Sequence, residues 1–124
     1  MMHQTILLTA LLACHYLADF CLTTPAMIRA KADGRNLWPI MLHAVVHALL
    51  MTICLLLMGI LWRVILSAMA VEWGTHFLID LAKARLSVQF PLLADQRQKP
   101  YWMLYGFDQL LHQLVVVGIW CYCT

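Results

Sequence analysis

Four apolar segments dominate the sequence, and each is about as long as a helix must be to cross a membrane. We place these segments at 3–22, 38–59, 61–83 and 101–122. A helix of about 20 apolar residues spans the ~30 Å hydrocarbon core of a bilayer. Only 11% of the residues are charged, against about 25% in soluble domains. The pattern predicts an all-α membrane protein, a four-helix transmembrane bundle that forms a single integral-membrane domain over residues 1–124.

The basic residues are distributed unevenly between the two ends of this bundle. The connections 23–37 and 84–100, together with Lys83, carry seven of the eight Lys and Arg residues, and the opposite end carries only Arg63. Cytoplasmic loops of membrane proteins carry an excess of Lys and Arg. We therefore expect both longer connections in the cytoplasm and both termini on the other side. The net charge of only +2 argues against nucleic acid as a partner.

Each apolar segment carries one pair of His or Asp residues at a spacing of four. This spacing places both side chains on one face of a helix, one turn apart. Alternate segments run in opposite directions, and counting inward from the basic end puts all four pairs in one layer of the membrane's cytoplasmic half. The pairs are His15 with Asp19, His43 with His47, His76 with Asp80, and Asp108 with His112.

These eight side chains are expected to face the bundle interior and to meet there, because an ionisable group that faces lipid costs several kcal/mol. Imidazole nitrogen and carboxylate oxygen are typical ligands of transition metals. The layer therefore predicts a site for one or two divalent transition-metal ions, with zinc favoured. The alternative is that the pairs only hold the helices together as hydrogen-bonded core groups.

Two further residues are candidates for catalytic roles beside this layer. Glu72 lies one helical turn before His76, where its carboxylate could act as a general base or as a hydrogen-bonding partner. Lys83 lies three residues after Asp80 and could contact an anionic substrate, or could extend to the membrane surface. Gln109 is expected to form a hydrogen bond between helices.

A basic rim above the site is formed by Arg29, Lys31, Arg35, Arg97 and Lys99. A metal-activated water below this rim indicates a metal-dependent hydrolase acting on an anionic or lipid-linked substrate, with membrane lipid as its surroundings. Three other functions fit parts of the pattern. A proton or metal-ion transporter also uses an intramembrane His/Asp cluster. Ligation of a haem by two His residues is disfavoured, because the His residues lie in one layer. A non-catalytic membrane adaptor would use the same residues as a structural core.

The motifs HYLADF, HAVVH, HFLIDLAK and FDQLLH, in this order and with Lys31 after the first, resemble a family of small bacterial and phage-borne inner-membrane proteins. That family is known only as a domain of unknown function. The resemblance covers nearly the whole chain and implies a bacterial inner membrane. In that membrane, the orientation expected from the basic residues puts both termini in the periplasm. The family pattern leads us to expect Gln near Thr23, where this chain reads LTT. A more distant similarity, to LexA-associated membrane-bound metal-dependent hydrolases, implies hydrolysis by analogy.

Overall fold

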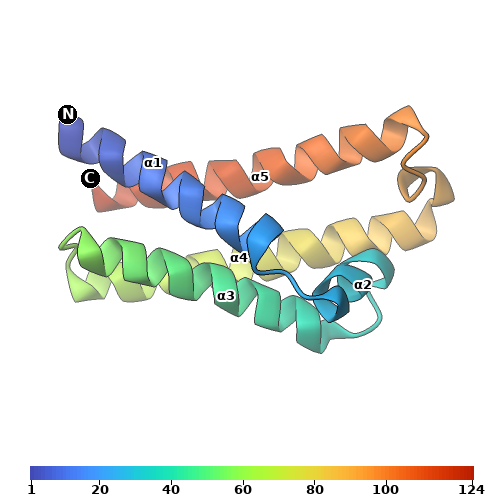
Figure 1. Cartoon of the computed structure of the whole chain (residues 1–124), viewed down its shortest axis with the longest axis horizontal. Coiled ribbons are helices and arrows are strands. Elements are labelled where there is room, and N and C mark those ends of the chain that lie inside the picture. The colour runs from blue at the N-terminus through green and yellow to red at the C-terminus, as the bar shows by residue number, and fades with distance from the viewer.

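The computed structural model describes residues 1–124, and every regular element in it is helical (Figure 1). Four long helices lie side by side, and a short helix packs against one end of them. A π-helical turn continues the first helix, and a 3-10 turn lies between the last two. The elements are α1 (Met2–Tyr16), η1 (Leu17–Cys21), α2 (Pro25–Asp33), α3 (Leu37–Leu57), α4 (Trp62–Gln89), η2 (Pro91–Leu93) and α5 (Lys99–Cys123).

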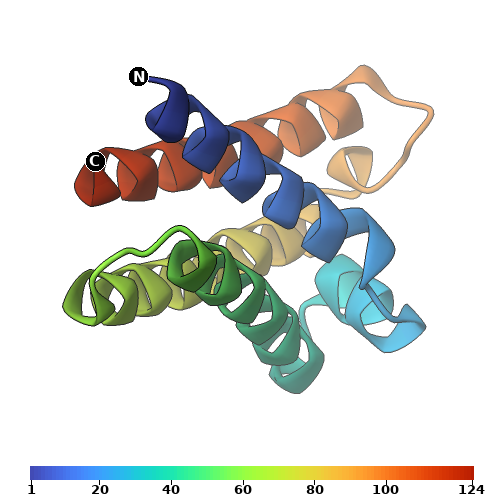
Figure 2. The ribbon, with the colours of Figure 1, turned by 60° about the vertical axis from the view of Figure 1, so that its left-hand side comes forward.

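The two ends of the bundle differ in what they carry. Both chain termini and the tight turn between α3 and α4 lie at one end, where Gly59 adopts a φ of 72° (Figure 1). The helix α2 and the connection between α4 and α5 lie at the other end (Figures 1 and 2). The prediction that the two longer connections share one end is therefore confirmed.

Three of the four long helices, rather than all four, are long and apolar enough to cross a membrane. They are α1 with η1, α3 and α4. The prediction of four such helices is corrected for α5, because Asp108, Gln109, His112 and Gln113 lie within two turns and lower its apolar character. The all-helical fold itself is confirmed, and α5 packs against α1 and α4.

The first connection contains a helix that sequence analysis treated as a loop. The helix α2 begins after Thr24, whose hydroxyl accepts a hydrogen bond of 3.3 Å from the backbone N–H of Met27, and Pro25 occupies its first turn. It ends at Gly34, which adopts the left-handed conformation that favours glycine. The helix α2 packs against α3 and α4 (Figure 2), and it brings the ammonium of Lys31 within 3.3 Å of Asp19 and 3.2 Å of Asp80.

An apolar core fills the half of the bundle nearest the termini. All four long helices contribute to it, from positions on the terminal side of their His residues. Its buried members are Leu7, Leu11, Met51, Cys54, Leu55, Ile65, Ala68, Val116 and Ile119. This core therefore closes one side of the polar layer that the His residues form.

Candidate metal centre

A layer of buried polar side chains crosses the bundle next to the apolar core. Every long helix contributes to it, and η1 adds Asp19, whose side chain is only 4% exposed. A π-helical turn such as η1 is a feature found frequently at functional sites. The other buried members are His15, His43, His47, Glu72, His76, Asp80, Asp108 and His112. The prediction that the four pairs point inward is therefore confirmed.

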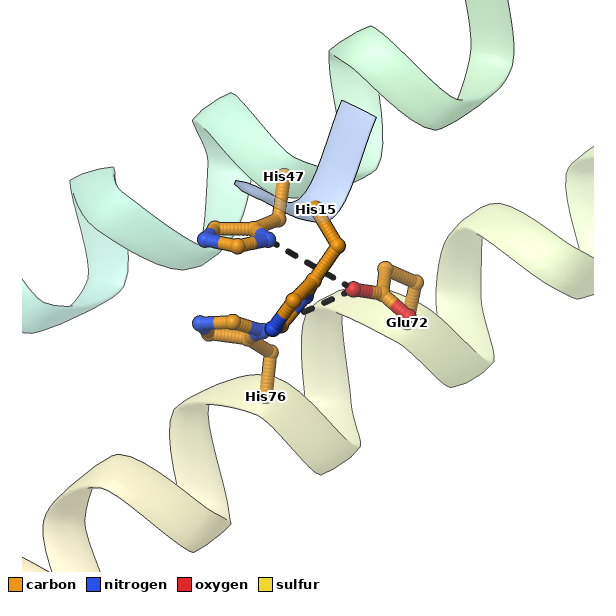
Figure 3. A group of neighbouring side chains, drawn as sticks. All are labelled: His15, His47, Glu72 and His76. Atoms are coloured by element: carbon orange, nitrogen blue, oxygen red, sulfur yellow. Dashed lines mark ion pairs between the residues drawn. The ribbon is translucent and has the colours of Figure 1, made fainter. Parts of the chain in front are cut away.

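One group of side chains in this layer, which we call the inner group, is drawn in Figure 3 and lies against residues of the apolar core. Its members are His15, His47, Glu72 and His76, whose potential ligand atoms all lie within 4.8 Å of one another. One oxygen of Glu72 lies 3.5 Å from Nδ1 of His76 and 3.8 Å from Nδ1 of His47. The rings of His47 and His76 have centroids 3.6 Å apart. Glu72 is thus placed to orient both imidazoles.

Two further groups with the same spread of ligand atoms share residues with the inner group. The middle group is Asp19, His43, His47 and His76. The outer group is His76, Asp80 and His112. His76 belongs to all three groups, so its ring is the common element of every metal-binding arrangement in the layer.

In the outer group, the Nε2 atoms of both His residues are unpaired, and Nδ1 of His112 is engaged in a hydrogen bond. Nδ1 of His112 donates to the backbone carbonyl of Asp108 at 2.8 Å, so Nε2 of the neutral ring carries a lone pair. Nδ1 of His76 faces Glu72, and its Nε2 lies 3.5 Å from Asp80. Both Nε2 atoms are buried and have no hydrogen-bond partner. Engagement of the far nitrogen by a carboxylate or carbonyl is typical of a His that binds metal.

The spacing within the outer group suits a metal ion. Nε2 of His112 lies 3.8 Å from Oδ1 of Asp80, which also has no hydrogen-bond partner. Two lone pairs that face each other in a buried site repel unless a proton or a cation lies between them. Ligand atoms at zinc bond lengths around a tetrahedral ion are roughly 3.3–3.4 Å apart. The observed 3.5 and 3.8 Å are therefore close to what such an ion requires.

The charges of the layer do not balance when the His residues are neutral. Four carboxylates, those of Asp19, Glu72, Asp80 and Asp108, face only two ammonium groups, those of Lys31 and Lys83. Uncompensated charge in a buried site is costly. One divalent cation would neutralise the two remaining negative charges, and so would two protons.

Lys31 reaches into the layer from α2. Its Nζ lies 3.3 Å from Asp19, 3.2 Å from Asp80 and 3.1 Å from Nε2 of His43. Burial of the ammonium lowers the pKa of Lys31, but the attraction of Asp80 and Asp19 outweighs burial and raises this pKa above its usual value. Sequence analysis placed Lys31 only on the basic rim. The Thr24–Pro25 start and the Gly34 stop are the signals that predict a helix there.

Asp108 is the one predicted ligand that the structure places in none of the three groups. Its carboxylate forms an ion pair of 2.7 Å with Lys83, which also lies over the ring of Tyr105. The other seven predicted ligands meet in the layer. Gln109 donates to Asp19 across the bundle at 2.9 Å, which confirms its predicted interhelical hydrogen bond.

Access to the layer differs between its two sides. On the side of α2 there is a pocket of about 490 Å³, whose lining includes Asp19, Lys31, Lys83 and Gln109. On the side of the apolar core a space of about 10 Å³ adjoins the inner group, which is about the room that one water needs. The polar layer is therefore reached from one side.

These observations define a helical protein with membrane-span-like helices and buried His/carboxylate groups that could hold a metal ion. The chain belongs to the family described as "Protein of unknown function (DUF3307)", which matches residues 7–124. This match is consistent with the resemblance to a family of unknown function. No curated protein sequence and no solved structure matches the chain.

Proposed function

We propose that this protein is a metal-dependent hydrolase embedded in a membrane, with a zinc ion bound by His76, Asp80 and His112. The observation that carries the proposal is the set of unpaired, facing ligand atoms in the outer group. Three protein ligands that leave a fourth position open are typical of catalytic zinc sites, whereas closed sets of four are typical of structural ones. The inner group, with four ligands, is the candidate for a second ion.

A bound zinc ion would lower the pKa of a coordinated water to about 7 and polarise the bond to be cleaved. The residues around it have separate tasks in this proposal. Glu72 lies 3.5 Å from Nδ1 of His76, and a carboxylate on that side favours Nε2 as the ring nitrogen that faces the ion. A substrate would enter through the pocket, and Lys31 and Lys83 would bind its negatively charged group at the floor of that pocket. Glu72 and Lys83 are thus positioning and substrate-binding groups.

One-sided access supports catalysis over transport. A transporter must open its site to both faces of the membrane. The apolar core lies beyond the inner group, and the pocket of about 310 Å³ beside Ala68 and Ile119 is lined by no residue of the layer. The 490 Å³ pocket, by contrast, leads to the layer from the α2 end. A non-catalytic adaptor would gain nothing from unpaired ligand atoms, which destabilise a core that binds no cation.

Asp80 and Asp108 offer a matched pair of variants, because both are buried aspartates four residues from a buried His. Asp80→Asn is expected to lower metal affinity by more than the roughly 10–100-fold that supporting residues contribute. Chelator-sensitive hydrolysis of 4-nitrophenyl phosphate should fall with it. Asp108→Asn should retain the metal, because its partner is Lys83. Full metal retention by Asp80→Asn, or a metal-loaded wild type without any esterase activity, would refute the proposal.

The proposed location is a bacterial inner membrane, with α2 and the α4–α5 connection in the cytoplasm. The three span-like helices and the basic residues at the α2 end support it. Reporter fusions at Thr124 and within residues 30–36 should therefore report opposite sides, with Thr124 in the periplasm. A cytoplasmic signal from the fusion at Thr124 would reverse the orientation.

A further inference from the structure

The pocket at the α2 end adjoins the proposed metal site. Its lining comes from η1, α2, α4, α5 and the connection that precedes α5. Two of its lining residues belong to the layer itself, because Asp19 is a member of the middle group and Lys31 contacts Asp80. A molecule in this pocket would therefore lie one side chain away from the outer group.

Three charged side chains line the pocket, and the two lysines, Lys31 and Lys83, are much more exposed there than the carboxylate of Asp19. The side chains of Lys31 and Lys83 are 19% and 20% exposed. Those of Asp19, Asp80 and Asp108 are 4%, 0% and 2% exposed. The two ammonium groups thus screen the carboxylates from the pocket. An entering molecule meets cations first, which favours an anion.

Neutral donors surround these two cations. The amide of Gln109 and the phenol groups of Tyr101 and Tyr105 line the same pocket, as does the hydroxyl of Ser87. A terminal phosphate carries up to two negative charges and three oxygens that accept strong hydrogen bonds. Two ammonium groups and several neutral donors match that charge and number of acceptors better than they match a carboxylate with two oxygens.

One edge of the pocket is apolar and exposed. Phe20 of η1 and Ile28 of α2 both line it, and they are 51% and 58% exposed. Leu17, the first residue of η1, and Leu22, directly after η1, are further exposed hydrophobic side chains. An acyl chain could leave the pocket along this edge while its polar head stayed inside.

We propose that the pocket binds the terminal phosphate of a membrane lipid. Such a lipid would be the substrate of the hydrolase proposed above, and the inference rests on that proposal. Hydrolysis would transfer the phosphoryl group from the lipid oxygen to a water oxygen. The proton released by that water would go to the lipid alkoxide, which leaves as an alcohol.

The test measures binding of dihexanoyl phosphatidic acid to the full chain in mild detergent, with its metal content recorded in each sample. Dihexanoyl phosphatidylcholine, which has the same acyl chains but no terminal phosphate, and inorganic phosphate are the comparison ligands. Phosphatidic acid is expected to bind at least about ten-fold more tightly than either, because each comparison ligand lacks one of the two recognised parts.

Two variants remove the pocket's features in different ways. Lys83→Met combined with Asp108→Asn deletes the ammonium without leaving a buried carboxylate unpaired, and Ser87→Phe fills the pocket without changing any charge. Each should weaken phosphatidic acid binding by about ten-fold or more, the size of one charge-assisted hydrogen bond. Lys99→Met removes the same charge from an exposed site outside the pocket and should leave binding within about two-fold.

The outcomes separate this inference from the proposed hydrolase. Equal affinity for inorganic phosphate and phosphatidic acid would overturn the lipid assignment, and equal affinity for phosphatidylcholine would overturn the phosphate assignment. Failure of the wild type to bind phosphatidic acid while it retains its metal would overturn the inference alone. Tight phosphatidic acid binding by wild-type protein that contains no metal would support the pocket and overturn the hydrolase.

Discussion

Replacing Lys31 with Met is expected to destabilise the metal-free protein by about 3–5 kcal/mol, the cost of removing one partner from a buried ion pair. Its ammonium is only 19% exposed and lies within 3.3 Å of both Asp19 and Asp80. Without it, two buried carboxylates would keep only His and Gln109 as neighbours. The measurement is the apparent free energy of unfolding in mild detergent after treatment with a chelator.

The same experiment has an internal check. Adding Asp80→Asn to Lys31→Met should recover part of the lost stability, because it removes one of the two unpaired charges. Bound metal should also reduce the effect, since a cation takes over part of the charge compensation. Lys99 is an exposed lysine at the same end of the bundle, and its replacement by Met should cost less than about 0.5 kcal/mol. Unchanged stability of the metal-free Lys31→Met variant would contradict the role given to Lys31.

The raised pKa of Lys31 determines how this stabilisation depends on pH. Because neighbouring carboxylates raise this pKa in the folded protein, the ammonium stabilises the fold at every pH below the ordinary pKa of a lysine. That contribution is lost only as the pH rises through the raised value. Lys31 therefore carries a positive charge, and stabilises the fold, at physiological pH.

Replacing His76 with Ala is expected to remove bound metal almost completely, which would be the largest functional effect of any single substitution in this chain. All three groups of potential ligands contain His76. Its Nδ1 faces Glu72 and its Nε2 faces Asp80, and without it the outer group, to which we assign the ion, keeps only Asp80 and His112. Losing a ligand should cost more than the roughly 10–100-fold that the loss of a supporting residue costs.

His3→Ala is the matched control for this variant, because His3 is exposed near the N-terminus and belongs to none of the groups. It should retain the full metal content. Thermal unfolding of both variants shows whether any loss of metal follows from loss of the fold. A folded His76→Ala protein with wild-type metal content would rule out all three groups as the binding site.

The periodicity of the sequence was sufficient to predict the polar layer. A spacing of four puts both members of a pair on the same face of a helix. That face is expected to point inward because ionisable groups that face lipid are costly. Seven of the eight predicted ligands meet for these reasons alone. The packing of α3 against α4 also follows from local signals, because only Gly59 and its neighbours separate the two apolar segments.

Spacing does not determine which partner each inward side chain finds. Asp80 and Asp108 have the same relation to a neighbouring His in the sequence, yet Asp80 faces His76 and His112 while Asp108 pairs with Lys83. That difference arises from the rotation of α4 and α5 about their axes, which only the packed bundle fixes. The position of Lys31 beside the layer depends in the same way on how α2 packs. This helix is too short to be recognised from an apolar periodicity in the sequence.

The measurement that tests the central claim most directly is elemental analysis of the wild-type chain, purified in mild detergent without a chelator. The outer group and the charge imbalance of the layer both predict about one divalent transition-metal ion per chain, with zinc favoured. A second ion would occupy the inner group. A metal content near zero would contradict the account and leave the layer as a protonated, hydrogen-bonded core.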